Sequence, residues 1–200
     1  MTQDDLIAAV AATAGHFRLE SGHHGDLWLN LDRLLGRPAA LRPFTAELGR
    51  RLAAYNIQAV CGPLTGGAFL AQQAAADLDV AFVYAERFAH PERTGLFPVE
   101  YRIPAALRAA VAGQRVAVLD DAINAGSAVR ATLADLAACG AQVGAIGALF
   151  VLGYAAADLA AETGLPLEHL AHVPSHRWVP AACPLCATGV PLQDPALPSR

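Results

Sequence analysis

The chain has 200 residues, of which 54% are hydrophobic and 16% charged, and its formal net charge at pH 7 is −4. This length and apolar content predict one soluble domain with a substantial core. The acidic balance leaves no basic stripe for a nucleic-acid backbone, so that class of partner is not indicated. Two uncharged stretches, 57–76 and 136–157, are each interrupted by glycines, which favours pairs of buried elements over membrane spans.

The N-terminal residues predict a helix. Thr2 is its expected cap, Asp4 and Asp5 lie in its first turn, and the helix is expected to run to Thr13 and end at Gly15. This start is acidic where a secretory signal would be basic, so we expect a cytoplasmic protein.

A strand-forming segment follows the predicted helix. Gly15 to Gly22 reads Gly-His-Phe-Arg-Leu-Glu-Ser-Gly and leads to the apolar run Leu27 to Leu31. The plain interpretation is an N-terminal strand that buries Phe17, Leu19 and Trp28.

The next elements alternate between helix and strand. Pro38 begins a helix expected to reach about Tyr55, with an apolar face made of Leu41, Phe44, Leu48 and Leu52. A short buried strand, 57–61, leads into the glycine-rich loop 62–67, and a helix should run from Ala68 to about Asp77. Free N–H groups and a positive dipole end make such a loop a candidate anion site.

A third strand, 80–85, ends in Glu86 and Arg87. Residues 90–98 then show no periodicity and contain two prolines and a glycine. This pattern predicts a mobile lid, and the alternative is a solvated surface loop.

The run from Val116 to Ala128 combines a strand, a site and the start of a helix. Four apolar residues precede Asp120 and Asp121, and a small-residue loop then leads to a helix with Ser127 as its possible N-cap and Gly140 as its end. The loop 124–128 could hold a phosphate through backbone N–H groups. The chain contains no lysine, which argues against a nucleotide P-loop.

The two carboxylates beside a phosphate site need an explanation, because like charges repel. A sugar phosphate resolves the conflict: its vicinal hydroxyls donate to Asp120 and Asp121, and Mg²⁺ on a second phosphate group offsets the charge. The alternative is an ordinary strand–turn–helix with exposed acids.

Residues 142–152 form the last predicted strand. Alternating strands and helices predict an α/β fold with a central parallel sheet flanked by helices, and ligands at the carboxyl ends of the strands. Both glycine loops fall at those ends.

The C-terminal part carries Cys183 and Cys186, spaced as half of a zinc knuckle. The other half could come from histidines or from a partner subunit. The alternative is a proline-rich tail folded over the domain. The four cysteines of the chain form no pattern typical of disulfides.

Residues 116–128 resemble the 5-phosphoribosyl-1-diphosphate (PRPP) motif of type I phosphoribosyltransferases, with Asn124 and Ala125 where that family often has threonines. The segment Gly15 to Gly22 resembles the hood of orotate phosphoribosyltransferases. The likeness covers about residues 15–153. It implies one domain over 1–200, made of a hood (1–35), an α/β core (36–153) and a C-terminal appendage (154–200).

The resemblance implies an enzyme that binds PRPP with Mg²⁺ and transfers its phosphoribosyl group to a base, most like orotate, as pyrophosphate leaves. No protein residue need bind the metal directly, because PRPP carries it. Homodimerisation is a further implication. By this likeness the catalytic residues are Asp120, Asp121 and Arg87. The implied PRPP-binding residues are Thr65, Gly66, Gly67, Arg87, His90, Arg93, Asp120, Asp121, Ala122, Ile123, Asn124, Ala125, Gly126, Ser127 and Ala128. The implied base-binding residues are Phe17, Trp28, Leu29 and Asn124.

The chain departs from the orotate pattern in its lid, where those enzymes carry a catalytic lysine and this chain offers His90, Arg93 and Arg102, and at two further places. Gly66 stands where those enzymes usually carry a lysine, and Leu152-Gly153-Tyr154 stands where they carry a base-binding arginine. Two alternatives therefore remain: a phosphoribosyltransferase for another base, and a PRPP-binding regulator without turnover.

Overall fold

The computed structural model describes residues 2–89 and 95–195. Its centre is a six-stranded sheet in the order β5-β4-β3-β6-β7-β8, in which β5 is antiparallel to β4 and the other neighbours are parallel. The strands are β3 (Ala59–Pro63), β4 (Ala81–Ala89), β5 (Val99–Arg102), β6 (Arg115–Ile123), β7 (Gln142–Leu152) and β8 (Leu167–Val173).

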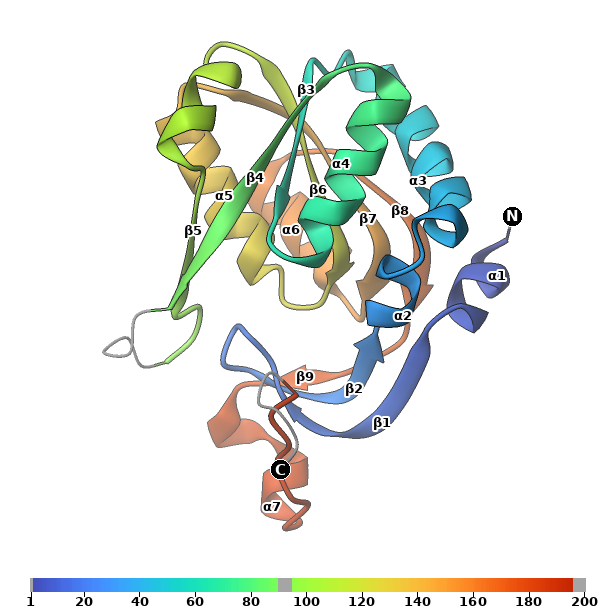
Figure 1. The fold of residues 1–200 in the computed structure, drawn as a ribbon. Coiled ribbons are helices and arrows are strands. Elements are labelled where there is room, and N and C mark those ends of the chain that lie inside the picture. The colour runs from blue at the N-terminus through green and yellow to red at the C-terminus, as the bar shows by residue number, and fades with distance from the viewer. Residues whose placement is uncertain (1, 90–94, 196–200) are drawn as a thin grey trace.

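Helices cover both faces of this sheet (Figure 1). Residues of α3 (Pro38–Leu52) and α4 (Gly66–Leu78) pack in one apolar cluster, and residues of α5 (Ser127–Ala138) and α6 (Ala155–Thr163) pack in the other. Successive residues of β6 point to opposite faces, so Leu119 joins the first cluster and Val118 the second, and both are 0% exposed. The predicted α/β class is confirmed.

A second, smaller sheet lies beside the carboxyl ends of the core strands (Figure 1). This hood sheet consists of the antiparallel strands β1 (Ala11–Arg18), β2 (His24–Asn30) and β9 (Arg177–Trp178). It is assembled from the two ends of the chain.

The N-terminal helix is shorter than predicted. Helix α1 spans Gln3–Ala8 and has the expected capping box, in which the Thr2 side chain accepts from the Asp5 N–H. The prediction that it runs to Thr13 is wrong, because Thr13 pairs with Trp28 in the hood sheet. Alanine has a high helix propensity, but propensity is a weak determinant of structure, and pairing with β2 overrides it here.

Most other boundaries agree with the sequence to within a few residues. Helix α3 buries the predicted apolar face, and β7 has the predicted bounds. Strand β3 begins two residues later than expected and α4 two residues earlier. Strand β4 continues past Ala85 because Glu86 and Arg87 pair with β5. The remaining short elements are α2 (Asp32–Leu35), α7 (Pro184–Ala187) and 3₁₀ turns at Ala53–Tyr55, Ala105–Ala110 and Pro180–Ala182.

The central sheet extends beyond residue 153, into the part that the sequence assigned to the C-terminal appendage. Strand β8 pairs with β7 from Leu167 to Val173 and forms the sheet edge. After β9 the chain runs along the hood, where the Arg18 N–H donates to the Gln193 carbonyl at 2.8 Å. Across the described ranges, no helix combines the length and the apolar character needed to cross a membrane.

Candidate active site

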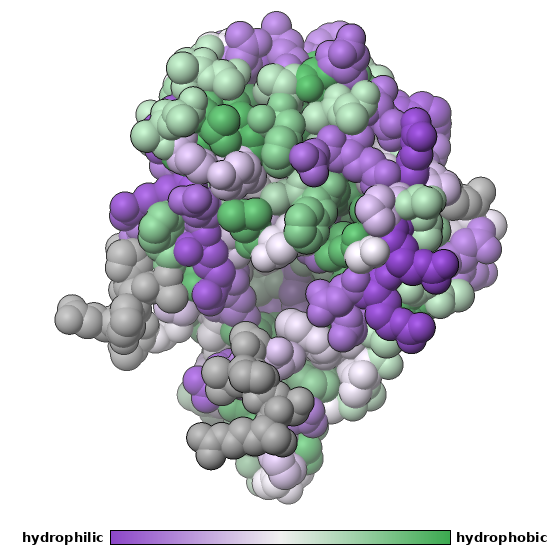
Figure 2. All heavy atoms as spheres, viewed as in Figure 1, coloured by the Kyte–Doolittle hydropathy of each residue, from purple (hydrophilic) through white to green (hydrophobic). Residues whose placement is uncertain are grey.

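A pocket of about 300 Å³ lies where the carboxyl ends of the core strands face the hood. Figure 2 shows the surface hollowed between the core above and the hood below. Residues 63–66 of the β3–α4 turn, the end of β6 and the β6–α5 turn (residues 124–128) form its core side, and Leu19, Glu20 and Trp28 form its hood side.

Two adjacent carboxylates lie on the floor of this pocket. Asp120 is 7% exposed and Asp121 is half-buried, and neither has an ion-pair partner among the described residues. Burial raises the pKa of Asp120 well above its usual value, and the neighbouring charges of Asp121 and Glu20 add to this effect. Burial also raises the pKa of Asp121. A ligand with hydroxyl donors, or a cation, would therefore stabilise the charged forms of these two carboxylates.

The β3–α4 turn passes directly against these carboxylates. A Cβ atom at Gly66 would overlap the Asp121 carboxylate, and one at Gly67 would lie 2.9 Å from Asp120 Oδ1. A lysine at position 66 would therefore displace Asp121, which gives a steric reason for glycine here. Gly66 and Thr65 line the pocket, while Gly67 packs behind Asp120.

The β6–α5 turn brings the start of α5 to the pocket. Gly126 adopts φ +75° and is the N-cap of α5, so the prediction that Ser127 is the cap is wrong. A left-handed residue is needed where the strand turns into the helix, and glycine adopts that conformation without steric cost. Ser127 is instead the first helical residue, and Ala122, Ile123, Asn124, Ala125, Gly126, Ser127 and Ala128 all line the pocket.

Glu20 connects the hood to three parts of the core. Its carboxylate accepts hydrogen bonds from Arg87 Nε at 2.8 Å, Tyr101 Oη at 3.1 Å and Ser127 Oγ at 3.0 Å. The sequence analysis assigned no role to Glu20 or Tyr101. The acid next to the Ser21-Gly22 turn was a usable signal for Glu20, whereas the four-residue β5 carries no pattern that marks Tyr101.

The comparisons with known proteins agree with this geometry. Residues 30–173 match the phosphoribosyl transferase domain. The chain belongs to the phosphoribosyltransferase family.

Curated relatives span almost the whole length of the chain. Orotate phosphoribosyltransferase from Pelotomaculum thermopropionicum is 29% identical over 199 residues, which is 98% of this chain and 97% of that protein. The orotate phosphoribosyltransferase of Thermotoga maritima is 28% identical over 197 residues, with the same two coverages.

Solved structures share the fold. The orotate phosphoribosyltransferase of Aeropyrum pernix superposes with a TM-score of 0.63 at 26% identity, covering 86% of this chain and 94% of that one. Adenine phosphoribosyltransferase from Thermoanaerobacter pseudethanolicus has a TM-score of 0.65 at 17% identity, covering 86% and 100%. The second likeness concerns the fold alone.

The residues expected to meet a base occupy different positions in this phosphoribosyltransferase. Trp28 lines the main pocket, and Trp28 and Leu29 line an adjoining cavity of about 280 Å³ that also includes Asn124. Phe17 is 3% exposed and packs against the Trp28 ring, 6.3 Å between centroids, and it does not line the main pocket.

An arginine that the sequence analysis did not single out lies on the same side. Arg177 of β9 donates from Nη1 to the Asn124 carbonyl at 3.0 Å and forms an ion pair with Asp158. It lines a cavity of about 330 Å³ together with Asn124 and the Leu152–Tyr154 segment. Only folding brings residue 177 to this point, so its position in the sequence gave no signal.

The predicted lid joins β4 to β5. His90 and Arg93 lie outside the described residues. Arg102 belongs to β5, pairs with Glu100 at 2.7 Å and lies over the Phe88 ring. Arg87 points instead into the pocket, held by Glu20.

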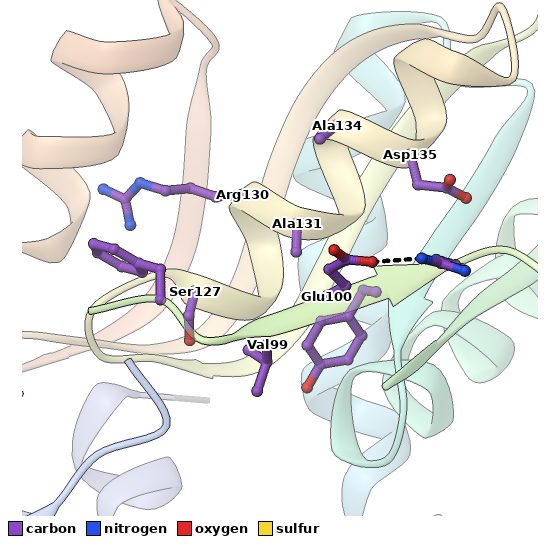
Figure 3. A pocket seen from close by; sticks show the side chains of 10 residues that line it. Val99, Glu100, Ser127, Arg130, Ala131, Ala134 and Asp135 are labelled. Carbon is purple, nitrogen blue, oxygen red and sulfur yellow. Dashed lines mark hydrogen bonds and ion pairs between the residues drawn. The ribbon is translucent and has the colours of Figure 1, made fainter. Parts of the chain in front are cut away.

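A larger hollow of about 450 Å³ lies between β5 and α5 (Figure 3). Its lining includes Val99, Glu100, Arg130 and Ala131, with the Arg130 guanidinium 5.3 Å from the centre of the Phe97 ring. It shares Ser127 and Tyr101 with the main pocket but does not include the paired carboxylates. The chemistry therefore belongs to the smaller pocket.

Proposed function

We propose that this phosphoribosyltransferase acts on orotate and forms orotidine 5′-monophosphate and pyrophosphate from PRPP in pyrimidine nucleotide synthesis. The observation that carries the proposal is the Asp120–Asp121 pair on the pocket floor, between two turns at the carboxyl ends of the strands. The curated relatives named as orotate enzymes support the choice of base.

The pocket suggests a role for each part. Asp120 and Asp121 accept the ribose hydroxyls, the β6–α5 turn holds the 5′-phosphate, and Thr65 and Gly66 face the pyrophosphate, with Gly67 packed behind Asp120. During transfer the bond from the ribose carbon to pyrophosphate breaks as the bond to the base nitrogen forms. Charge builds on the pyrophosphate and drains from the sugar ring, so the contribution of the chain is positional and electrostatic.

Oxygen-rich surroundings suit a Mg²⁺ ion that arrives with PRPP. The carboxylates of Asp120 and Asp121 lack a cation partner among the described residues, and carboxylate oxygen is a ligand that Mg²⁺ prefers. These two residues would hold the complex, and the ion would supply charge neutralisation for the pyrophosphate.

The contacts of Glu20 would change when PRPP binds. In the free protein this carboxylate accepts hydrogen bonds from the Ser127 hydroxyl and from Arg87. Both of these groups are expected to contact the phosphates of bound PRPP. When the 5′-phosphate accepts the hydrogen bond of Ser127, Glu20 loses that contact. Arg87 can then turn from Glu20 to the pyrophosphate. His90 and Arg93 are assigned to the same charge by family likeness.

Recognition of the base rests on a different residue from the usual one. The Leu152-Gly153-Tyr154 segment lacks the arginine that the resemblance leads one to expect. Arg177, 3.0 Å from the Asn124 carbonyl, is a guanidinium that could pair with the orotate carboxylate. The same missing arginine favours a second candidate, phosphoribosyl transfer to another base.

Pyrophosphate release tests the proposal. The purified chain is mixed with PRPP, Mg²⁺ and, in separate reactions, orotate, uracil and the common purines. Release with orotate alone is expected. Release with a different base would move the assignment to the second candidate, and tight PRPP binding without release would indicate a regulator.

A variant sharpens the test of the base. Arg177→Gln should raise the KM for orotate and leave the KM for PRPP nearly unchanged. An equal rise in both constants would show that Arg177 supports the hood rather than the base.

Homodimerisation and a cytoplasmic location belong to the same proposal. The β4–β5 hairpin projects from the core (Figure 1), and Phe88 on it is 39% exposed. Such a ring suits contact with a second copy. The molar mass in solution, measured by light scattering, tests the dimer.

A further inference from the structure

Four potential metal ligands converge on the hood. His16 comes from β1, His24 from β2, Cys183 directly precedes α7, and Cys186 lies within it. One ligand atom of each lies within 4.8 Å of all the others. The sequence indicated the two cysteines and left the other ligands to histidines or a partner subunit. The fold supplies two histidines more than 150 positions away along the chain.

The separations match those around a single tetrahedral ion. His16 Nε2 lies 3.0 Å from His24 Nδ1 and 3.4 Å from the Cys183 sulfur, and the Cys186 sulfur lies 3.2 Å from His24 Nδ1 and 3.7 Å from His16 Nε2. Zinc bonds of about 2.0–2.1 Å to nitrogen and 2.3 Å to sulfur place tetrahedral ligands about 3.3–3.8 Å apart. The cluster therefore needs only small shifts to close around an ion.

The tautomer of His16 also supports a metal site. Its Nδ1 lies 2.8 Å from the Val190 carbonyl oxygen, which can only accept, so Nδ1 carries the proton. The neutral ring then directs the bare lone pair of Nε2 into the cluster. Metal-binding histidines typically donate their other ring N–H to a carbonyl or carboxylate in this way.

Burial adds a second argument. His16 is 1% exposed, His24 7% and Cys183 4%, while most of the surrounding segment 180–193 is exposed. A segment with so little apolar burial needs another source of stability, and a structural metal is a common one. The donor set of two imidazoles and two thiols is typical of zinc.

We propose that His16, His24, Cys183 and Cys186 bind one structural Zn²⁺ ion. The ion joins the C-terminal segment to the first two strands of the hood. Four protein ligands complete its coordination, so no position remains for a substrate. In Figure 1 α7 lies on the side of the hood away from the core, which separates the ion from Asp120 and Asp121.

The position of the ion suggests what it stabilises. Glu20 follows His16 by four residues and Trp28 follows His24 by four, and both line the main pocket. Fixing β1 and β2 at the histidines would hold β2, which carries Trp28, and the β1–β2 turn, which carries Glu20. The ion is thus a structural element of the cover over the pocket.

Metal content of the full-length protein tests the site. The chain is purified without chelator or added metal, and zinc is measured by plasma mass spectrometry. We expect one zinc per chain in the wild type and in the control Cys139→Ser, a free cysteine at the end of α5, and at least a tenfold loss in Cys186→Ser. Cys186 is exposed, so this substitution leaves no buried hydroxyl. Undiminished zinc in Cys186→Ser would overturn the proposal.

A second measurement needs no variant. The metal is removed with a chelator under reducing conditions, and Co²⁺ is added to the wild-type protein. We expect the visible bands of tetrahedral cobalt, a thiolate-to-cobalt charge-transfer band, and an increase in the thermal unfolding midpoint when Zn²⁺ replaces Co²⁺. Absence of these bands, or a Cys183–Cys186 disulfide in the protein as purified, would overturn the proposal.

Discussion

The core and the hood both line the same pocket, but different interactions hold them in place. Strands β6 and β7 are buried between two layers of helices, with residues such as Val118 and Phe150 at 0% exposure. The hood sheet has three strands, and the first four residues of β1 are exposed. Its strand β2 places Leu29 in the first core cluster, and Glu20 joins the hood to the pocket rim through polar contacts. The floor of the site is therefore rigid, and its cover depends on a few specific groups.

Truncating one aromatic ring in each region should reveal this difference most strongly. Phe150→Ala should lower the free energy of unfolding by about 3–5 kcal/mol, because it leaves a cavity in the sheet centre. Phe17→Ala in the hood should cost clearly less, since its ring packs on Trp28 outside both core clusters. Urea unfolding measures both. Equal losses would mean that the hood is as tightly integrated as the core.

Asp121→Asn tests the floor of the pocket. Removing this charged acceptor should weaken PRPP binding by about 1–3 kcal/mol, measured by calorimetry in the presence of Mg²⁺. Asp79→Asn is a matched control, because Asp79 is exposed at the end of α4 and asparagine tolerates its left-handed backbone. Unchanged affinity in Asp121→Asn would remove this carboxylate from the ribose site.

Asp120→Asn tests what the buried charge costs the free protein. Burial raises the pKa of Asp120, so the folded state binds its proton more tightly than the unfolded chain does. The contribution of this proton to the free energy of unfolding is fully present below the pKa of Asp120 in the unfolded chain, about 3.9. It is lost as the pH rises through the pKa of Asp120 in the folded protein. At pH 7 the substitution should therefore increase the free energy of unfolding, by about 1–3 kcal/mol.

The pH profile distinguishes this effect from ordinary repacking. The difference in unfolding free energy between Asp120→Asn and the wild type should widen as the pH rises above 4, and it should be small at lower pH. A difference that does not change with pH would show that the charge of Asp120 is not the cause.

Glu20→Gln tests the hood contact and should have the smallest effect. The Glu20 carboxylate accepts hydrogen bonds from Ser127 and Arg87 and so competes with the phosphates for these two groups. Glutamine at position 20 should therefore strengthen PRPP binding by about 0.5–1.5 kcal/mol. Glu47→Gln on α3 is the control, because its ion pairs with Arg50 and Arg51 are on the surface of that helix. Weaker binding in Glu20→Gln would mean that Glu20 organises the β6–α5 turn instead of competing for it.

Local patterns predicted the core well. The apolar run ending in Asp120 and Asp121 indicated a buried strand with a site at its carboxyl end, and β6 has that arrangement. The bounds of β7 and the apolar face of α3 were also predicted. Burial on both faces of a parallel sheet demands continuous apolar residues, which is a strong signal. The family resemblance rested on the same residues and is confirmed.

The hood and the termini could not be predicted in the same way. Residues 11–14 have the composition of a helix and become a strand only because β2 lies beside them. Strand β8 has no strong alternation, and its place at the sheet edge depends on pairing with β7. The contact of Arg177 with Asn124 joins residues far apart in the chain.

The amino-acid sequence by itself determined the α/β order, the acid pair and the two turns that flank it, because each depends on neighbours within about ten residues. Only the tertiary structure decided which distant groups complete the site. Glu20 reaches Ser127 because the hood lies against the start of α5, and His16 and His24 reach Cys183 and Cys186 through the pairing of β2 with β9, strands from opposite ends of the chain. Such pairings are selected by the packing of the whole molecule, and no local pattern records them.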